Sequence, residues 1–253
     1  MKSPAELSRR RFLARTLGAT GVLALAGCDA LSEKEWFPRL LGTGEKLSSV
    51  AQHLIAPRRA MAQEFTEADL SPRFRSNGTS MPANPQYLAL AAGGFADYRL
   101  AVGGLVEKPA SLSLAELRAL PSRTQITRHD CVEGWSAIGK WKGARLSALL
   151  EAVQPKPQAR FVVFHCADRK NPYYESIDLE DAFHPQTILA YDLNDRTLPI
   201  PNGAPARLRV ERQLGYKHAK YVMRIELVES FEKIRGGKGG YWEDQGYEWW
   251  AGI

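Results

Sequence analysis

The chain has 253 residues, with 34 Lys and Arg against 28 Asp and Glu, which gives a formal net charge of +6 at pH 7. Residues 1–27 hold five basic residues and one acidic residue, a charge of +4, so the remaining chain carries only +2. This charge balance excludes a generally basic nucleic-acid-binding surface, and we expect no nucleic acid partner. It leaves open the possibility of a local cluster of basic residues.

The first 28 residues have the pattern of an export signal. A twin-arginine start, SRRRFL at 8–13, precedes an uncharged stretch at 16–27 that is too short to span a bilayer. The stretch ends in LAGC at 25–28, which is similar to the lipobox of bacterial lipoproteins, whose cysteine is acylated. We therefore expect residues 1–27 to be a signal peptide and Cys28 to anchor a periplasmic protein to the membrane. The alternative is an ordinary cleaved signal in which Cys28 is incidental.

Residues 28–90 read as an extended arm and linker. They carry five prolines among short charged and apolar pieces, and only 47–55 has a helical pattern. Residues 91–253 are long enough for a substantial core and show no repeat of 20 to 50 residues, so we expect one domain there, with the arm lying over it.

From residue 98 onward the pattern is regular. Residues 99–102 alternate as a strand, Ser113 and Glu116 form a capping box for a short helix ending near residue 120, and 124–128 is typical of a strand leading to Cys131. Further elements are expected as a helix at 146–150, a buried strand at 161–164, a helical turn at 179–183, and strands at 188–193, 206–210 and 221–228. Helices and strands without strict alternation indicate an α+β fold with a mostly antiparallel or mixed sheet.

Cys131 is the best candidate for chemistry. It lies in DCVEGWS at 130–136, a polar and aromatic block that is followed by WKG at 141–143. One alternative is a disulfide with Cys166, and another is a papain-like nucleophile, although the local signature of those enzymes is missing. The bases considered for such a nucleophile are His165, His184 and His218.

Other standard motifs are absent or weak. The chain has no CxxC, HExxH or complete P-loop motif GxxxxGK(S/T), so zinc-finger, zincin and P-loop sites lack their sequence patterns, and it has no CxxCH for covalent haem. GGKGG at 236–240 precedes no recognisable helix start, so a flexible surface turn is favoured over a phosphate loop. We expect the C-terminal aromatic residues to pack in the core or an interface rather than to stack on a substrate. These residues are Trp242, Tyr247, Trp249 and Trp250.

Four blocks together resemble the molybdopterin domain of the sulfite oxidase superfamily. They are DCVEGWS at 130–136, WKG at 141–143, NGAPAR at 202–207 and LGYKxxK at 214–220, in the family's order. The resemblance covers about residues 70–250 and is nearest to the bacterial periplasmic branch of protein-methionine-sulfoxide reductase catalytic subunits. It implies a sulfite-oxidase-like molybdopterin-binding fold and a molybdenum-molybdopterin cofactor.

The same resemblance implies roles for individual residues. In the family one protein cysteine ligates molybdenum, the other sulfur ligands come from the pterin dithiolene, and Cys131 matches that cysteine. A soft thiolate suits this metal. Cofactor-contacting positions of the family match Asn77, Asn202, Arg207, His218, Ala219 and Lys220.

Three further positions carry expectations. Cys166 stands where the reductase branch has a cofactor-contacting threonine, so we expect it to line the pocket. Glu133 is a candidate proton carrier, with an exposed structural carboxylate as the alternative. Arg207 and Arg209 fit a cradle for the cofactor phosphate, and a solvated strand face is the alternative.

The implied function is oxygen-atom or electron transfer on a small or protein-bound sulfur compound, or on an S- or N-oxide. Electrons are expected to pass to or from a membrane haem or quinol-linked partner, with the enzyme itself a monomer. A lipid-anchored binding or scaffold protein that uses the same fold without metal is the alternative from another class.

Overall fold

The computed structural model describes Trp36, residues 59–168 and residues 173–253. Residues 58–253 form one compact unit. The expected signal peptide, the acylation site Cys28 and the helix expected at 47–55 lie outside the described residues, so these expectations stay predictions. Within the described ranges, none of the helices combines the length and apolar character that crossing a bilayer requires.

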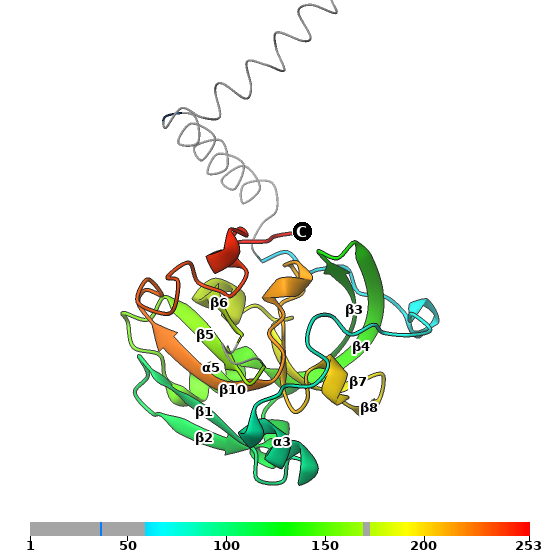
Figure 1. Ribbon diagram of the computed structural model, residues 1–253, viewed down its shortest axis with the longest axis horizontal. Helices are drawn as coiled ribbons and strands as arrows, with labels where there is room; N and C mark the ends of the chain where they lie inside the picture. Colours follow the sequence, from blue (N-terminus) through cyan, green and yellow to red (C-terminus); the bar gives the residue numbers. More distant parts are fainter. Residues whose placement is uncertain (1–35, 37–58, 169–172) are drawn as a thin grey trace, which may run out of the picture. The chain divides into compact units, whose positions relative to one another are not determined.

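The first sheet of the described unit is mixed (Figure 1). Its strands are β1 (Arg99–Gly104), β2 (Ala110–Ser113), β5 (Phe161–Cys166), β6 (Tyr174–Asp178) and β10 (Val222–Val228), in the order β2-β1-β10-β5-β6. β1 and β10 run parallel, and the other neighbours run antiparallel. The strands expected at 99–102, 161–164 and 221–228 are confirmed as β1, β5 and β10.

The second sheet is antiparallel and carries Cys131. It consists of β3 (Ser122–Cys131), β4 (Trp135–Arg145), β7 (Ile188–Leu193), β8 (Arg196–Thr197) and β9 (Arg207–Arg209), with β9 paired to β7. β3 and β4 pair along their full length, and Cys131 is opposite Trp135. The turn between these two residues uses Gly134 at φ +83°, where glycine has no steric penalty. Cys131 therefore lies at the tip of a long hairpin.

In the described part of the chain, four short α-helices accompany the sheets. They are α3 (Pro85–Ala92), α4 (Leu114–Ala119), α5 (Leu146–Val153) and α6 (Leu179–Ala182). The capping box of α4 is confirmed, because the Ser113 hydroxyl accepts from the Glu116 amide and the Glu116 carboxylate accepts from the Ser113 amide. Helical structure at 146–150 and 179–183 is also confirmed, by α5 and α6.

The helix α3 corrects the expectation of an arm whose only helix is at 47–55. The Asn84 side chain caps it by accepting from the amides of Gln86 and Tyr87. Pro85 occupies the first turn, where a missing N–H costs nothing, so this proline begins a helix instead of breaking one. Before α3, residues 59–84 follow the second sheet. Backbone amides at 65 and 71 donate to β3 and β4, at 2.9 and 3.1 Å.

The core lies where α5 meets both sheets. Its largest cluster joins α5 to the first sheet through fully buried Leu150, Val162 and Ile225, and to the second sheet through Leu189 and Leu208. The fold is thus α+β, as expected. It leaves the Cys131 end of the β3–β4 hairpin outside the core, next to the 3₁₀ turn η3 (Gly215–Lys217) and the C-terminal segment, orange and red in Figure 1.

Candidate active site

A cavity of about 200 Å³ surrounds the tip of the β3–β4 hairpin and is called here the Cys131 cavity. Several expected site residues line it: Asn77, Cys131, Glu133, His218 and Lys220. They come from the arm, the hairpin and the stretch after β9, so the fold brings together residues more than 140 positions apart in the sequence.

The Cys131 thiol lies at the boundary between the core and the cavity. Its residue is 9 % exposed and neither it nor Cys166 is in a disulfide. Burial raises the pKa of the Cys131 thiol, and the nearby cations Arg207 and Arg75 act in the opposite direction. A bound metal ion is the kind of charge that turns such a thiol into a thiolate ligand.

Arg207 is a fully buried cation with no carboxylate among its described contacts. Its guanidinium donates to the Asn202 carbonyl at 3.0 Å and to the Asn77 Oδ1 at 3.3 Å, and its Nε has no partner. Burial, and then the neighbouring Arg209, lower the pKa of Arg207 to about 9. A charge buried in this way needs an anion, which a cofactor phosphate would supply.

Arg209 is also fully buried, so the alternative of a solvated strand face is wrong for both arginines. The pair is packed on the ring of Trp141, with guanidinium carbons 5.3 and 4.5 Å from its centroid for Arg207 and Arg209. This gives the WKG block at 141–143 a physical role, because the indole face stabilises two cations.

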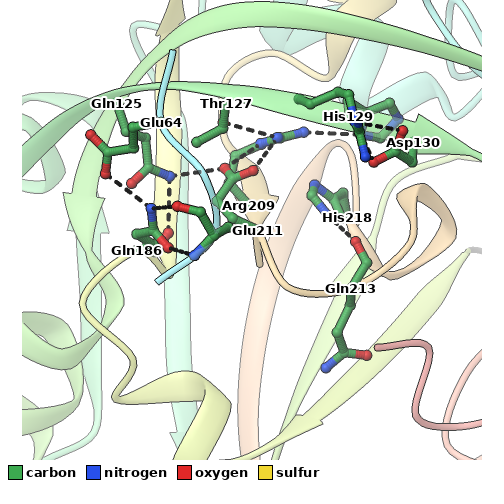
Figure 2. A network of polar contacts seen from close by, with 12 residues as sticks. Glu64, Gln125, Thr127, His129, Asp130, Gln186, Arg209, Glu211, Gln213 and His218 are labelled. Carbon is green, nitrogen blue, oxygen red and sulfur yellow. Dashed lines mark hydrogen bonds and ion pairs between the residues drawn. The ribbon is translucent and has the colours of Figure 1, made fainter. Parts of the chain in front are cut away.

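Figure 2 shows how Arg209 is held. Its guanidinium pairs with the buried Glu211 carboxylate and donates to His129 Nδ1 at 3.0 Å. Glu211 in turn accepts from the Gln125 amide at 2.8 Å, and Gln125 reaches the Gln186 carbonyl at 3.0 Å. The network thereby fixes the His129 ring two residues before Cys131.

The rings of His129 and His218 meet edge to face, with centroids 5.0 Å apart. Arg209 donates to Nδ1 of His129, so the proton of this ring lies on Nε2, which is buried without a partner. His218 uses Nε2 to donate to the Gln213 carbonyl at 3.0 Å, which leaves its Nδ1 unpaired. Burial, followed by the nearby arginines, holds the pKa of each ring well below its usual value. Sequence reasoning missed His129, whose signal was its place in β3.

Lys220 ties the arm to the site. Its ammonium donates to the carbonyls of Asn77, Thr79 and Pro201 at 2.7, 2.5 and 2.8 Å. Burial, and then Arg207, lower its pKa to about 7. The arm residue Asn77 reaches the cavity because of this clamp.

These features fit an anionic, polar cofactor. The unpaired buried atoms His218 Nδ1, Arg207 Nε and Asn202 Nδ2 lie in residues at or directly behind the cavity wall. Buried polar groups of this kind are normally satisfied, so they point to a ligand. Among the described residues no group of three or more His, Cys, Asp or Glu side chains could hold a metal ion.

Four expected site residues do not line the cavity: Cys166, Asn202, Arg207 and Ala219. Cys166 lies in the main core cluster, 4 % exposed, because the side chain at this position of β5 points inward. Burial raises the pKa of its thiol well above the usual value. Ala219 is also in the core cluster, and Asn202 lies behind the wall and contributes its carbonyl to Arg207.

The structure does not support His165 or His184 as a base for Cys131, or the glycine-rich loop at 236–240 as a phosphate site. His165 is paired with Glu226 at 2.9 Å and His184 with the Ala60 carbonyl at 3.2 Å, and neither lines the cavity. The backbone amides of Gly236 and Lys238 already donate to Asp244, both at 3.1 Å, so this loop binds a carboxylate of its own chain.

Comparisons with known proteins agree with this site. Residues 89–233 match the family model "Oxidoreductase molybdopterin binding domain". A chain of Azospira oryzae, named "Putative protein-methionine-sulfoxide reductase subunit YedZ1", is 37% identical over 97% of this chain and 88% of its own length. The protein-methionine-sulfoxide reductase catalytic subunit MsrP of Xanthomonas axonopodis pv. citri is 32% identical over 87% of this chain and 70% of its own.

A solved structure supports the fold. The sulfane dehydrogenase SoxCD from Paracoccus pantotrophus matches 56% of this chain, and 40% of its own chain, with a TM-score of 0.51 and 26% identity. The match thus spans less than half of that protein chain. Both the family model and the relatives cover most of the cavity-forming residues, and the chain is therefore a molybdopterin-dependent oxidoreductase of the sulfite oxidase family.

Proposed function

We propose that the protein reduces methionine sulfoxide, free or within proteins, at a molybdenum site held by Cys131. The observation that carries the proposal is the Cys131 thiol at the edge of a cavity, with the buried cation Arg207 behind the cavity wall, where its guanidinium donates to the lining residue Asn77. The names of both relatives refer to a protein-methionine-sulfoxide reductase, which favours reduction over sulfite-type oxidation.

Individual residues have distinct parts in this proposal. Cys131 gives the metal its protein thiolate, Arg207 and Lys220 balance the charge of the cofactor phosphate, and Asn77 and His218 hold polar atoms of the pterin. Asn202 orients Arg207, while Cys166 and Ala219 support the pocket from the core. When bound, the cofactor supplies the electron pair that the sulfoxide takes up.

Protons are the second requirement of the reaction. Reduction of a sulfoxide to a sulfide takes two electrons and two protons and releases one water. Glu133 lies on the cavity wall, where its carboxylate accepts from the Trp135 indole N–H at 3.0 Å. We propose that Glu133 passes a proton to the departing oxygen.

A partner must supply the electrons. The relatives are named as subunits, which supports a second subunit, and we propose a membrane haem protein linked to quinol. The twin-arginine and lipobox patterns at 8–13 and 25–28 support a periplasmic, lipid-anchored enzyme, which would lie close to such a partner.

Metal analysis tests the proposal. Protein from cells that make the cofactor should contain about one molybdenum per chain, and it should reduce methionine sulfoxide with a reduced dye as electron donor. X-ray absorption at the molybdenum edge should show one sulfur ligand fewer in Cys131→Ala and no change in Cys166→Ala, the matched control. Loss of the ligand in Cys166→Ala alone would reverse the assignment. Oxidation of sulfite without sulfoxide reduction would reject the reductase.

A further inference from the structure

We propose that the C-terminal segment, residues 229–253, forms the substrate-recognition wall of the Cys131 cavity, with Trp242 and Tyr247 binding the alkyl arms of an organic sulfoxide. The inference rests on the proposed sulfoxide reduction and adds the residues that choose the substrate. The family match ends at residue 233, whereas the lining of the cavity includes two aromatic residues beyond that point, Trp242 and Tyr247.

The wall is a continuous set of aromatic rings. Trp242 and Tyr247 are stacked with centroids 5.3 Å apart, and Tyr216 meets Tyr247 edge to face at 5.2 Å. Tyr241 extends the set from Trp242, at 5.3 Å, to Tyr173, at 5.6 Å. Four of these five rings line the cavity, and Tyr241 supports them from behind.

This proposal departs from the expectation that the C-terminal aromatic residues pack in the core or an interface rather than stack on a substrate. Trp249 does pack, since its ring is stacked on Phe231 at 5.7 Å and meets Phe161 at 5.4 Å. Tyr247 is different, because it remains 41 % exposed at the mouth of the cavity. An exposed ring beside a binding cavity is available to a ligand.

The charges of the lining favour a neutral substrate over an oxyanion. The charged lining residues in the described part of the chain are one base, Lys220, and two acids, Glu133 and Asp168. Burial and Arg207 lower the pKa of Lys220 to about 7, so it offers only part of a positive charge at neutral pH. Among the described lining residues the acids outnumber the base, which favours a neutral sulfoxide, with its polar S–O group and apolar arms, over sulfite or a related dianion.

The alkyl arms of an organic sulfoxide are chemically suited to contact with the aromatic rings of the wall. Sulfur makes favourable contacts with aromatic rings, and the methyl and methylene groups beside it add apolar area that the same rings can cover. The polar part of the cavity, which includes Cys131, Asn77 and Glu133, remains for the oxygen. The two kinds of lining therefore correspond to the two ends of a dialkyl or alkyl-aryl sulfoxide.

A buried ionic cluster keeps the wall in place. The Lys217 ammonium, fully buried, lies 2.5 Å from carboxylate oxygens of Glu175 on β6 and of Glu243 in the 3₁₀ turn η4 (Glu243–Gln245). Trp242 directly precedes Glu243. The Tyr216 hydroxyl adds a bond to the Glu248 carbonyl at 2.7 Å. The rings are thus preorganised, which lowers the entropic cost of binding a small ligand.

Calorimetric titration of the oxidised holoenzyme with methyl p-tolyl sulfoxide and with a methionine-sulfoxide peptide tests the wall without turnover. The double variant Trp242→Leu and Tyr247→Leu should raise Kd about tenfold. KM should rise by a similar factor while kcat stays near the wild-type value. Trp242→Phe, which keeps a ring, should retain most of the affinity.

The control is Phe183→Leu, because Phe183 is 40 % exposed, close to the value for Tyr247, and is not part of the lining. Unchanged molybdenum content and melting temperature establish that each variant is folded. Equal Kd and KM in the double variant and the wild type would overturn the recognition wall and leave the reductase standing. A wild type that neither binds nor reduces organic sulfoxides would overturn both.

Discussion

Lys220 shows how burial acts on one charge at the scale of a residue. Its pKa falls from 10.5 to about 7, through burial first and Arg207 second, against the opposite effects of Asp168 and Glu133. Between these two values the unfolded chain binds a proton that the folded, cofactor-free protein does not. Stability therefore rises with pH across this window, and below pH 7 the cost of charging the buried amine is present in full.

We expect the unfolding free energy of the cofactor-free wild type, relative to Lys220→Met, to increase from pH 7 to pH 10. Urea unfolding of both proteins at each pH measures this difference, and the comparison cancels groups that titrate alike in both. A difference that is constant over this range would contradict the lowered pKa.

Sequence reasoning at this scale was strongest where a motif was local. The strand pattern at 124–128 placed Cys131 at the end of a strand, and its position at the end of β3 confirms this. Arg207 and Arg209 were harder, because alternating arginines on a strand also fit a solvated face. Their burial depends on Trp141, Glu211 and other distant residues, so only the assembled structure reveals it. Cys166 was expected in the pocket, but the inward side of β5 was not readable from an apolar run without alternation.

At the scale of an element, β4 was missed because its sequence is poor in strand formers. It contains Gly139 and Gly143 and several charged residues. The strand forms because β3 and β7 pair with it on both sides. The strands with apolar runs and the helix with a capping box could be predicted because their signals are local. The helix α3 was missed because Pro85 was taken for a breaker.

Gly143 makes the packing of β4 testable. A Cβ there would lie 2.3 Å from the Leu189 oxygen and 2.6 Å from the Ala190 Cα, both in the backbone of β7. We expect Gly143→Ala to lower the unfolding free energy by about 1–3 kcal/mol, since the two strands must separate. The matched control is Gly103→Ala in β1, where nothing lies within 4 Å of the added carbon. Denaturant unfolding measures both, and equal losses would refute the close approach.

At the scale of the whole molecule, the cofactor site joins parts that are distant in the sequence. Asn77 comes from the arm, Arg207 from β9 and Lys220 from the stretch before β10. A ligand that binds only the folded state adds about 2.7 kcal/mol when present at 100 times its Kd. Each kcal/mol shifts the Tm by about 2–4 °C in a domain of this size.

We therefore expect protein from cells that make the cofactor to melt at least about 5 °C higher than protein from cells that cannot. Arg207→Met should reduce this difference, because it removes the buried cation that meets the phosphate. Scanning calorimetry of the two preparations provides the measurement. Identical melting temperatures despite a full complement of molybdenum would rule out a cofactor that links these parts.

The central place of β10 in the first sheet determines how late during synthesis this sheet can form. β10 is the last strand along the chain, yet it is the central strand, between β1 and β5. Until the ribosome has added residues 222–228, β1 and β5 have no partner on their inner edges, and such open edges promote aggregation. Pairing residues 101–104 with 224–227 also closes a loop of most of the domain, which is a slow step. The nascent chain consequently has to stay unassembled and protected until its final strand emerges.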